Sequence, residues 1–243
     1  MTEPLTEPVK ITVACLDMAG TTVADDGSVM AAFTTALDRF GPAPGSAAHS
    51  AAMRVVHDTM GQSKIEVFRE ILGDEATAQH ANDVFEDTYA AEVGAGRVTA
   101  LPGAAEAITA LCDAGIQVCL LTGFSPATRD EIIDRLGWQP LIDLALSPAD
   151  VGRGRPWPDL PLTALLRLGG GAVSELAVVG DTPSDVETGR RAGAGLVAGV
   201  LTGRATRDEL EAAKAPHVLD TIADLLPLAG VRPRPGPQAQ AQG

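Results

Sequence analysis

The chain has 243 residues, of which 45% are hydrophobic and 21% are charged, a composition typical of an ordinary globular protein. Its 32 acidic and 18 basic residues give a formal net charge of −14, which disfavours nonspecific binding to nucleic acid or to an anionic membrane surface. No segment approaches ~18 uninterrupted apolar residues, so we expect no transmembrane helix and no membrane partner.

Two features indicate the compartment. The first residues, MTEPLTEPVK, lack the basic start and apolar run of a secretory signal, so export is not expected. The three cysteines lie in apolar runs without paired spacing, which fits a reducing cytosol and no zinc site. We therefore expect a cytoplasmic protein.

Short apolar segments alternate with helical segments along most of the chain. We predict buried strands at residues 11–17, 116–122, 176–181 and 195–203. Helices are predicted at residues 104–115, 125–137, 158–169 and 184–193, each of which ends on a glycine. This alternation predicts an α/β fold, with a Rossmann-like parallel sheet covered by helices on both faces.

One long segment interrupts the alternation. Between about residues 29 and 92 the sequence predicts only consecutive helices, and this insertion directly follows the first strand. We therefore predict a helical cap domain with hinges near residues 25–27 and 94–102. The expected organisation is a catalytic core, a cap and two flexible tails, with bounds of 9–24 plus 98–229 for the core, 25–97 for the cap, and 1–8 and 231–243 for the tails.

Chemically competent residues follow several of the predicted strands. Asp17 ends the first strand, Thr122 ends the second, and Asp181 follows the third, with Asp185 shortly after and Arg155 in the loop between. In an open parallel sheet, ligands bind beyond the carboxyl ends of the strands. Each residue alone is also compatible with a helix cap, a turn or a surface charge. Their combination favours phosphoryl transfer, in which carboxylates hold Mg²⁺, Thr and Arg bind phosphate oxygens, and one Asp forms an aspartyl-phosphate.

Four segments carry a family resemblance. DMAGTT from Asp17, LLTG from Leu120, GRGRP from Gly152 and GDTPSD from Gly180 occur in the order of the four motifs of the haloacid dehalogenase superfamily and resemble them. The match spans residue 11 to about residue 229. The helical insertion resembles the small α-helical cap of that superfamily.

The resemblance implies roles for individual residues. Asp17 is the implied nucleophile, Thr122 the phosphate-binding hydroxyl, and Arg155 the charge-balancing residue in place of the more usual lysine. The implied ligands of Mg²⁺ are Asp17, the backbone carbonyl of Ala19, Asp181 and Asp185. The implied substrate or phosphate contacts are Ala19, Gly20, Thr21, Met60, Gly61 and Gly123.

The absence of one expected residue helps to choose among the subfamilies of this superfamily. Superfamily phosphatases usually carry a second Asp two residues after the nucleophile, as general acid for an alkoxide leaving group, and here that position is Ala19. DMAGTT closely resembles the first motif of phosphonoacetaldehyde hydrolases (phosphonatases). MGQSK, from Met60 to Lys64, resembles their Met-Gly-x-x-Lys segment, whose lysine forms a Schiff base with the aldehyde.

Two positions depart from the phosphonatase pattern. The proton-transferring His three residues after the lysine is Val67 here, and the usual Tyr after the second-motif Gly is Phe124. Lys64 is one of only three lysines against 15 arginines, and a Schiff base needs the primary amine that Arg lacks. A solvated cap lysine or a plain phosphate contact stays open for Lys64.

The leading hypothesis is a Mg²⁺-dependent hydrolase that cleaves the C–P bond of phosphonoacetaldehyde or a related small phosphonate. The alternatives are a phosphate monoesterase acting on a small phosphorylated metabolite and a non-catalytic binding homologue. The resemblance also suggests a homodimer.

Overall fold

The computed structural model describes residues 10–232 and contains one six-stranded sheet. All neighbouring strands are parallel, in the order β3-β2-β1-β4-β5-β6. The strands are β1 (Val13–Asp17), β2 (Gln117–Leu121), β3 (Leu144–Leu146), β4 (Leu176–Gly180), β5 (Leu196–Val200) and β6 (His217–Leu219). The predicted α/β fold with a parallel sheet is confirmed, and β3 and β6 are additional to the four strands expected from the sequence.

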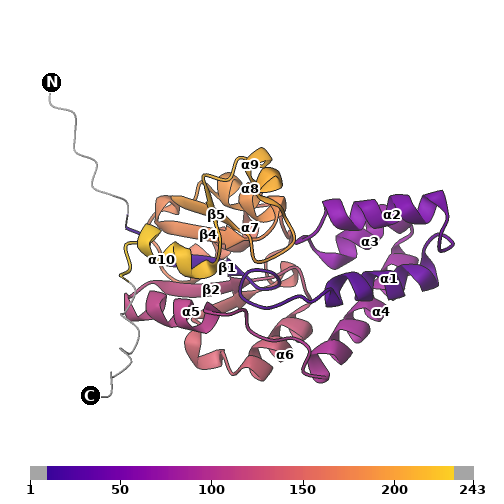
Figure 1. Ribbon diagram of the computed structural model, residues 1–243, viewed down its shortest axis with the longest axis horizontal. Helices are drawn as coiled ribbons and strands as arrows, with labels where there is room; N and C mark the ends of the chain where they lie inside the picture. The colour runs from indigo at the N-terminus through magenta and orange to yellow at the C-terminus, as the bar shows by residue number, and fades with distance from the viewer. Residues whose placement is uncertain (1–9, 233–243) are drawn as a thin grey trace, which may run out of the picture.

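Helices cover both faces of the sheet, α5 and α6 on one side of Figure 1 and α7 to α9 on the other. They are α5 (Ala104–Asp113), α6 (Pro126–Leu136), α7 (Asp159–Arg167), α8 (Pro183–Ala192), α9 (Arg207–Ala212) and α10 (Leu225–Leu228). Single 3₁₀ turns lie at Gln139–Leu141, Pro148–Asp150, Val173–Glu175 and Ile222–Asp224.

The central strand β1 is buried on both faces, as expected of a parallel sheet between two helical layers. Successive side chains of a strand point to opposite faces. Ala14 and Leu16 accordingly join the larger apolar cluster, whereas Val13 and Cys15 join a second cluster that includes Leu160 of α7. The carboxyl end of β1 is thereby fixed by packing from both sides.

Helices α1 to α4, which follow β1 and precede α5, form a helical unit beside the sheet (Figure 1). Residues 28–94, all within the described range, contain four helices and no strand, which confirms the predicted helical insertion. The helices are α1 (Ser28–Phe40), α2 (Ala47–Asp58), α3 (Lys64–Leu72) and α4 (Glu75–Gly94). Phe33, Phe68 and Phe85 from three of these helices pack together at its centre, with ring centroids 4.7–6.2 Å apart.

The two chain crossings between the sheet and the helical unit lie side by side. The N–H of Ala24 donates to the carbonyl of Thr99 at 2.8 Å, and the N–H of Leu101 donates to that of Thr22 at 2.9 Å. Val23 and Ala100 form an antiparallel bridge between them. The two connecting segments are thus hydrogen-bonded to each other close to the predicted hinges.

The predicted tails lie mostly outside the described residues. Val231, where the C-terminal tail was expected to begin, is buried, and its N–H donates to the carbonyl of Leu226 at 2.8 Å. Within residues 10–232, no helix is long and apolar enough to cross a membrane.

Candidate active site

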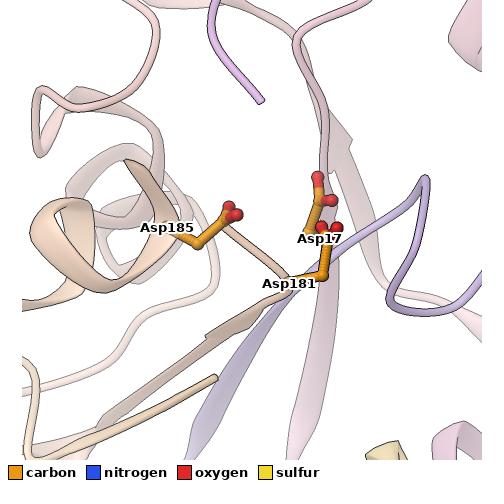
Figure 2. A group of neighbouring side chains, drawn as sticks. All are labelled: Asp17, Asp181 and Asp185. Atoms are coloured by element: carbon orange, nitrogen blue, oxygen red, sulfur yellow. The ribbon is translucent and has the colours of Figure 1, made fainter. Parts of the chain in front are cut away.

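Three carboxylates meet at the carboxyl edge of the sheet (Figure 2). Asp17 is the last residue of β1, Asp181 directly follows β4, and Asp185 lies in the first turn of α8. One carboxylate oxygen from each lies within 4.8 Å of the other two, and all three residues are buried. The structure therefore brings together the three acidic residues that the sequence placed at separate positions.

Glycines make room for these carboxylates. A Cβ at Gly20, whose φ is +83°, would lie 2.5 Å from Oδ2 of Asp181, and one at Gly203 would lie 2.0 Å from the same oxygen. At Gly180 a Cβ would lie 2.1 Å from Cγ of Asp185. Gly180 and Gly203 were not among the predicted site residues, and the available signal was their position at the end of a predicted strand.

Arg155 links two of the carboxylates. Its Nη1 donates to Oδ1 of Asp17 at 2.6 Å and also to Oδ1 of Asp185. The other oxygen of Asp185 accepts from the N–H and the hydroxyl of Thr182, in a capping box at the start of α8. Both oxygens of Asp185 are thus occupied by protein donors.

Asp181 has more freedom to bind an ion. Its Oδ2 accepts from the N–H of Arg204 at 2.9 Å, and its Oδ1 has no donor among residues 10–232. Burial and the neighbouring Asp17 and Asp185 raise the pKa of Asp181 well above its usual value. Burial, with Asp185 adding to it and Arg155 opposing it, raises the pKa of Asp17 to about 6.

This donor set fits a divalent cation. Hard cations prefer carboxylate oxygens, and a bound cation would relieve the repulsion that raises the pKa values of Asp17 and Asp181. Asp17 and Asp181 are the side chains best placed to hold it. Asp185 already accepts hydrogen bonds from Arg155 and Thr182. It could bind the cation directly only if it gave up one of these partners.

One cavity of about 100 Å³ connects most of the residues expected from the sequence. Among them, its lining includes Asp17, Ala19, Gly20, Met60, Gly61, Lys64, Thr122, Gly123, Arg155 and Asp181. Two expected residues lie behind this lining: Asp185, and Thr21, whose buried hydroxyl has no hydrogen-bond partner among the described residues. The lining residues that the sequence did not single out are Asp25, Val29, Thr182, Thr202, Gly203 and Arg204.

Lys64 is the first residue of α3 and is only 6% exposed. Its Nζ lies 5.1, 5.8 and 6.0 Å from the ring centroids of Phe124, Phe33 and Phe85. It donates one long hydrogen bond, 3.4 Å, to the carbonyl of Gln62, and no carboxylate of residues 10–232 lies within 4.0 Å of it. Burial, reinforced by the charge of Arg155, lowers the pKa of Lys64 to about 8.

The helical unit is closed over this cavity. A Cβ at Gly123 would lie 2.3 Å from the carbonyl oxygen of Gln62, so the second-motif loop and the loop before α3 touch through backbone. At the other side, Glu86 of α4 accepts from the hydroxyls of Ser125 and Thr128 at the start of α6. These contacts place Lys64 beside the carboxylate cluster.

The two positions that depart from the phosphonatase pattern are both apolar and buried. Val67 packs within the helical unit. The ring of Phe124 stacks on that of Tyr89 with centroids 4.5 Å apart, and the buried Tyr89 hydroxyl has no partner among the described residues.

A family model described as haloacid dehalogenase-like hydrolase matches residues 11–193, and the chain belongs to this family. The resemblance of its four motifs to that superfamily is therefore confirmed. The fold, the family and its relatives make the chain a phosphonatase-like or phosphatase-like hydrolase, and hydrolases of this family generally use a divalent metal.

Named relatives and solved structures agree with this assignment. Phosphonoacetaldehyde hydrolase of Bordetella pertussis is 28% identical over 92% of each chain. The crystal structure of a hydrolase from Pseudomonas syringae has a TM-score of 0.77 at 26% identity, covering 89% of this chain and 96% of that one. A phosphonoacetaldehyde hydrolase like protein from Oleispira antarctica has a TM-score of 0.73 at 23% identity over 95% of each chain, which shows a shared fold.

Proposed function

We propose that this protein is a Mg²⁺-dependent hydrolase that cleaves the C–P bond of phosphonoacetaldehyde or a closely related β-carbonyl phosphonate. The observation that carries the proposal is Lys64, a buried primary amine with a pKa lowered to about 8, which lines the same cavity as Asp17. A plain phosphate contact needs a charged ammonium, whereas imine formation needs a partly unprotonated amine. The phosphonoacetaldehyde hydrolases among its relatives support the same reading.

The phosphoryl half of the reaction uses the core residues. Asp17 attacks phosphorus and forms an aspartyl-phosphate, while the Thr122 hydroxyl and Arg155 bind phosphoryl oxygens. Arg155 already donates to Asp17, so it also orients the nucleophile. Mg²⁺, held by Asp17, Asp181 and the Ala19 carbonyl, would neutralise charge on the phosphoryl group. Water then hydrolyses the aspartyl-phosphate.

The carbon half of the reaction uses Lys64. Its unprotonated Nζ adds to the aldehyde carbon, and the resulting carbinolamine takes up one proton from solvent and expels its hydroxyl as water. The protonated imine that remains accepts the electron pair of the breaking C–P bond. The carbon leaves as an enamine, and protonation followed by hydrolysis releases acetaldehyde and regenerates the amine. This leaving group does not need the general acid that Ala19 replaces.

Release of inorganic phosphate tests the proposal. The wild-type protein should release phosphate from phosphonoacetaldehyde with Mg²⁺ and should lose this activity in EDTA. A panel of small phosphate monoesters should be much poorer substrates. Phosphate release from the monoesters alone would reject C–P cleavage, and no release from any compound would favour the non-catalytic homologue.

A phosphate monoesterase is the second candidate. It is favoured by Val67 and Phe124, which leave the carbonyl side of the cavity without the two polar groups of the phosphonatase pattern. In that case Lys64 contacts phosphate and its conversion to Arg is tolerated. The suggested homodimer and the cytoplasmic location stay predictions, and light scattering checks the first.

A further inference from the structure

We propose that Arg204 binds a carboxylate on the substrate, in the cavity that Asp17 and Lys64 also line. The substrate class is then a small phosphonate or phosphate that carries a carboxylate a few bonds from its phosphorus. This inference rests on the proposed function, because it takes the phosphoryl group to lie at Asp17.

The backbone around Arg204 is fixed to the carboxylate cluster. The N–H of Arg204 donates to Oδ2 of Asp181 at 2.9 Å, and the hydroxyl of Thr202 donates to the carbonyl of Gly20 at 2.7 Å. Gly203 between them lies so close to Asp181 that a Cβ would overlap its carboxylate. The loop after β5 therefore fixes the backbone of Arg204 beside the central cavity, which this residue lines.

Arg204 is an exposed residue whose guanidinium makes no ion pair among residues 10–232, although the chain has 32 acidic and only 18 basic residues. No carboxylate of residues 10–232 lies within 4.0 Å of it, whereas Arg155, the other arginine of the cavity lining, is bonded to Asp17 and Asp185. The neighbouring carboxylate of Glu209 accepts from the N–H and the hydroxyl of Thr206. Arg204 is thus a cation on the cavity wall that has no ion-pair partner in the described part of the chain.

A second cavity meets the first at Arg204. It has a volume of about 170 Å³ and lies between the end of α2 and the start of α8 and α9. The two cavities share the lining residues Met60, Thr182 and Arg204. A substrate that enters through the second cavity passes the guanidinium before its phosphoryl group reaches Asp17.

A carboxylate suits this position better than a second phosphate. The planar guanidinium can donate two parallel hydrogen bonds to a carboxylate. A single arginine balances one negative charge, and the carboxylates of Asp25 and Asp181 in the same lining oppose the larger charge of a phosphate.

A matched pair of substrates tests the proposal. Phosphonoacetaldehyde and 3-phosphonopyruvate share a carbonyl next to the phosphonate-bearing carbon, and only the second carries a carboxylate. We expect the wild type to have the lower KM for 3-phosphonopyruvate. Arg204→Gln should raise that KM about tenfold or more relative to the KM for phosphonoacetaldehyde, since hydrogen bonds between charged groups are strong. Arg207→Gln, a nearby arginine that pairs with Asp220 and lines neither cavity, is the control.

A binding measurement keeps this test separate from the proposed function. Phosphonoacetate and ethylphosphonate cannot form an imine and differ in the carboxylate. With Mg²⁺ present, phosphonoacetate should raise the melting temperature of the wild type more than ethylphosphonate does, and Arg204→Gln should abolish the difference. Equal shifts for the two compounds, or an equal loss of both in the variant, would overturn the role of Arg204. Absent turnover with a carboxylate-dependent shift would overturn only the proposed C–P cleavage.

Discussion

The carboxylate cluster of the sheet edge and the Lys64 pocket of the helical unit both bury charge, but in different ways. Asp17, Asp181 and Asp185 are held by strand ends, by backbone donors and by Arg155. Lys64 has no ion pair within the described chain and faces three aromatic rings. The cluster thus gathers more negative charge than Arg155 compensates and is suited to a cation, whereas the pocket lowers the pKa of its amine to about 8.

The two regions suit two different steps of the proposed reaction. Phosphoryl transfer needs charged groups at fixed places, and the sheet supplies these from segments that are far apart in the sequence. Imine formation needs a neutral amine, which a desolvated position supplies. Each of the following experiments changes one region while the other reports on the fold.

The largest effect is expected for Asp17→Asn. An amide is a far weaker nucleophile, so phosphate release should fall at least about a thousandfold. The fold should be retained, because Arg155 keeps its bond to Asp185. Phosphate release under saturating substrate measures the effect, with the exposed Asp208→Asn as control. A loss of less than tenfold would exclude covalent catalysis by Asp17.

The second largest loss of activity is expected for Lys64→Arg. The variant keeps a positive charge but cannot form an imine, so phosphonate cleavage should fall at least about a hundredfold. In the wild type, kcat/KM should rise with pH through about 8 as the amine loses its proton. Lys10→Arg, at an exposed position, is the control. An active Arg variant with an unchanged pH profile would support the phosphate monoesterase instead.

Removal of the metal should affect the carboxylate cluster alone. Mg²⁺ should raise the melting temperature of the wild type by several degrees, because it binds the folded state and relieves repulsion between buried carboxylates. Asp181→Asn should lose most of this shift, and Lys64→Arg should keep it. The thermal shift is measured without substrate and so does not depend on turnover. An unchanged shift in Asp181→Asn would contradict its role as a ligand.

A smaller effect on stability is expected from Lys64→Met. Because the folded-state pKa of Lys64 lies near 8, below the usual value of 10.5, protonation destabilises the folded protein. The penalty is complete below pH 8 and disappears as the pH rises toward 10.5. The variant should therefore be more stable than the wild type at pH 7 by about 1–3 kcal/mol and nearly equal to it at pH 10.5, as measured by urea unfolding. Equal stability at pH 7 would show that Lys64 is not desolvated.

The carboxylates at the sheet edge could be predicted because each of them has a recognisable local sequence pattern. Asp17 and Asp181 follow apolar β-branched runs, and parallel strands bring such ends together whatever their separation in the chain. The strands β3 and β6 were missed because three residues are too few for a periodic pattern.

The surroundings of Lys64 were harder to predict from the sequence. Phe33 and Phe85 lie 31 and 21 residues from Lys64, on helices α1 and α4, and only the packing of the helical unit brings their rings near the amine. The motif suggested Lys64, but its burial and lowered pKa required the structure. No local pattern marks Arg204 as a site residue, because only the fold brings its loop into contact with Asp181.

Chemical trapping at Lys64 tests the central claim most directly. The protein is incubated with phosphonoacetaldehyde and Mg²⁺, treated with borohydride, and digested for mass spectrometry. An imine at Lys64 would be reduced to a stable secondary amine, so we expect a substrate-dependent adduct on the peptide that carries Lys64 and none in Lys64→Arg. Phosphate release without any adduct at Lys64 would contradict the proposed mechanism.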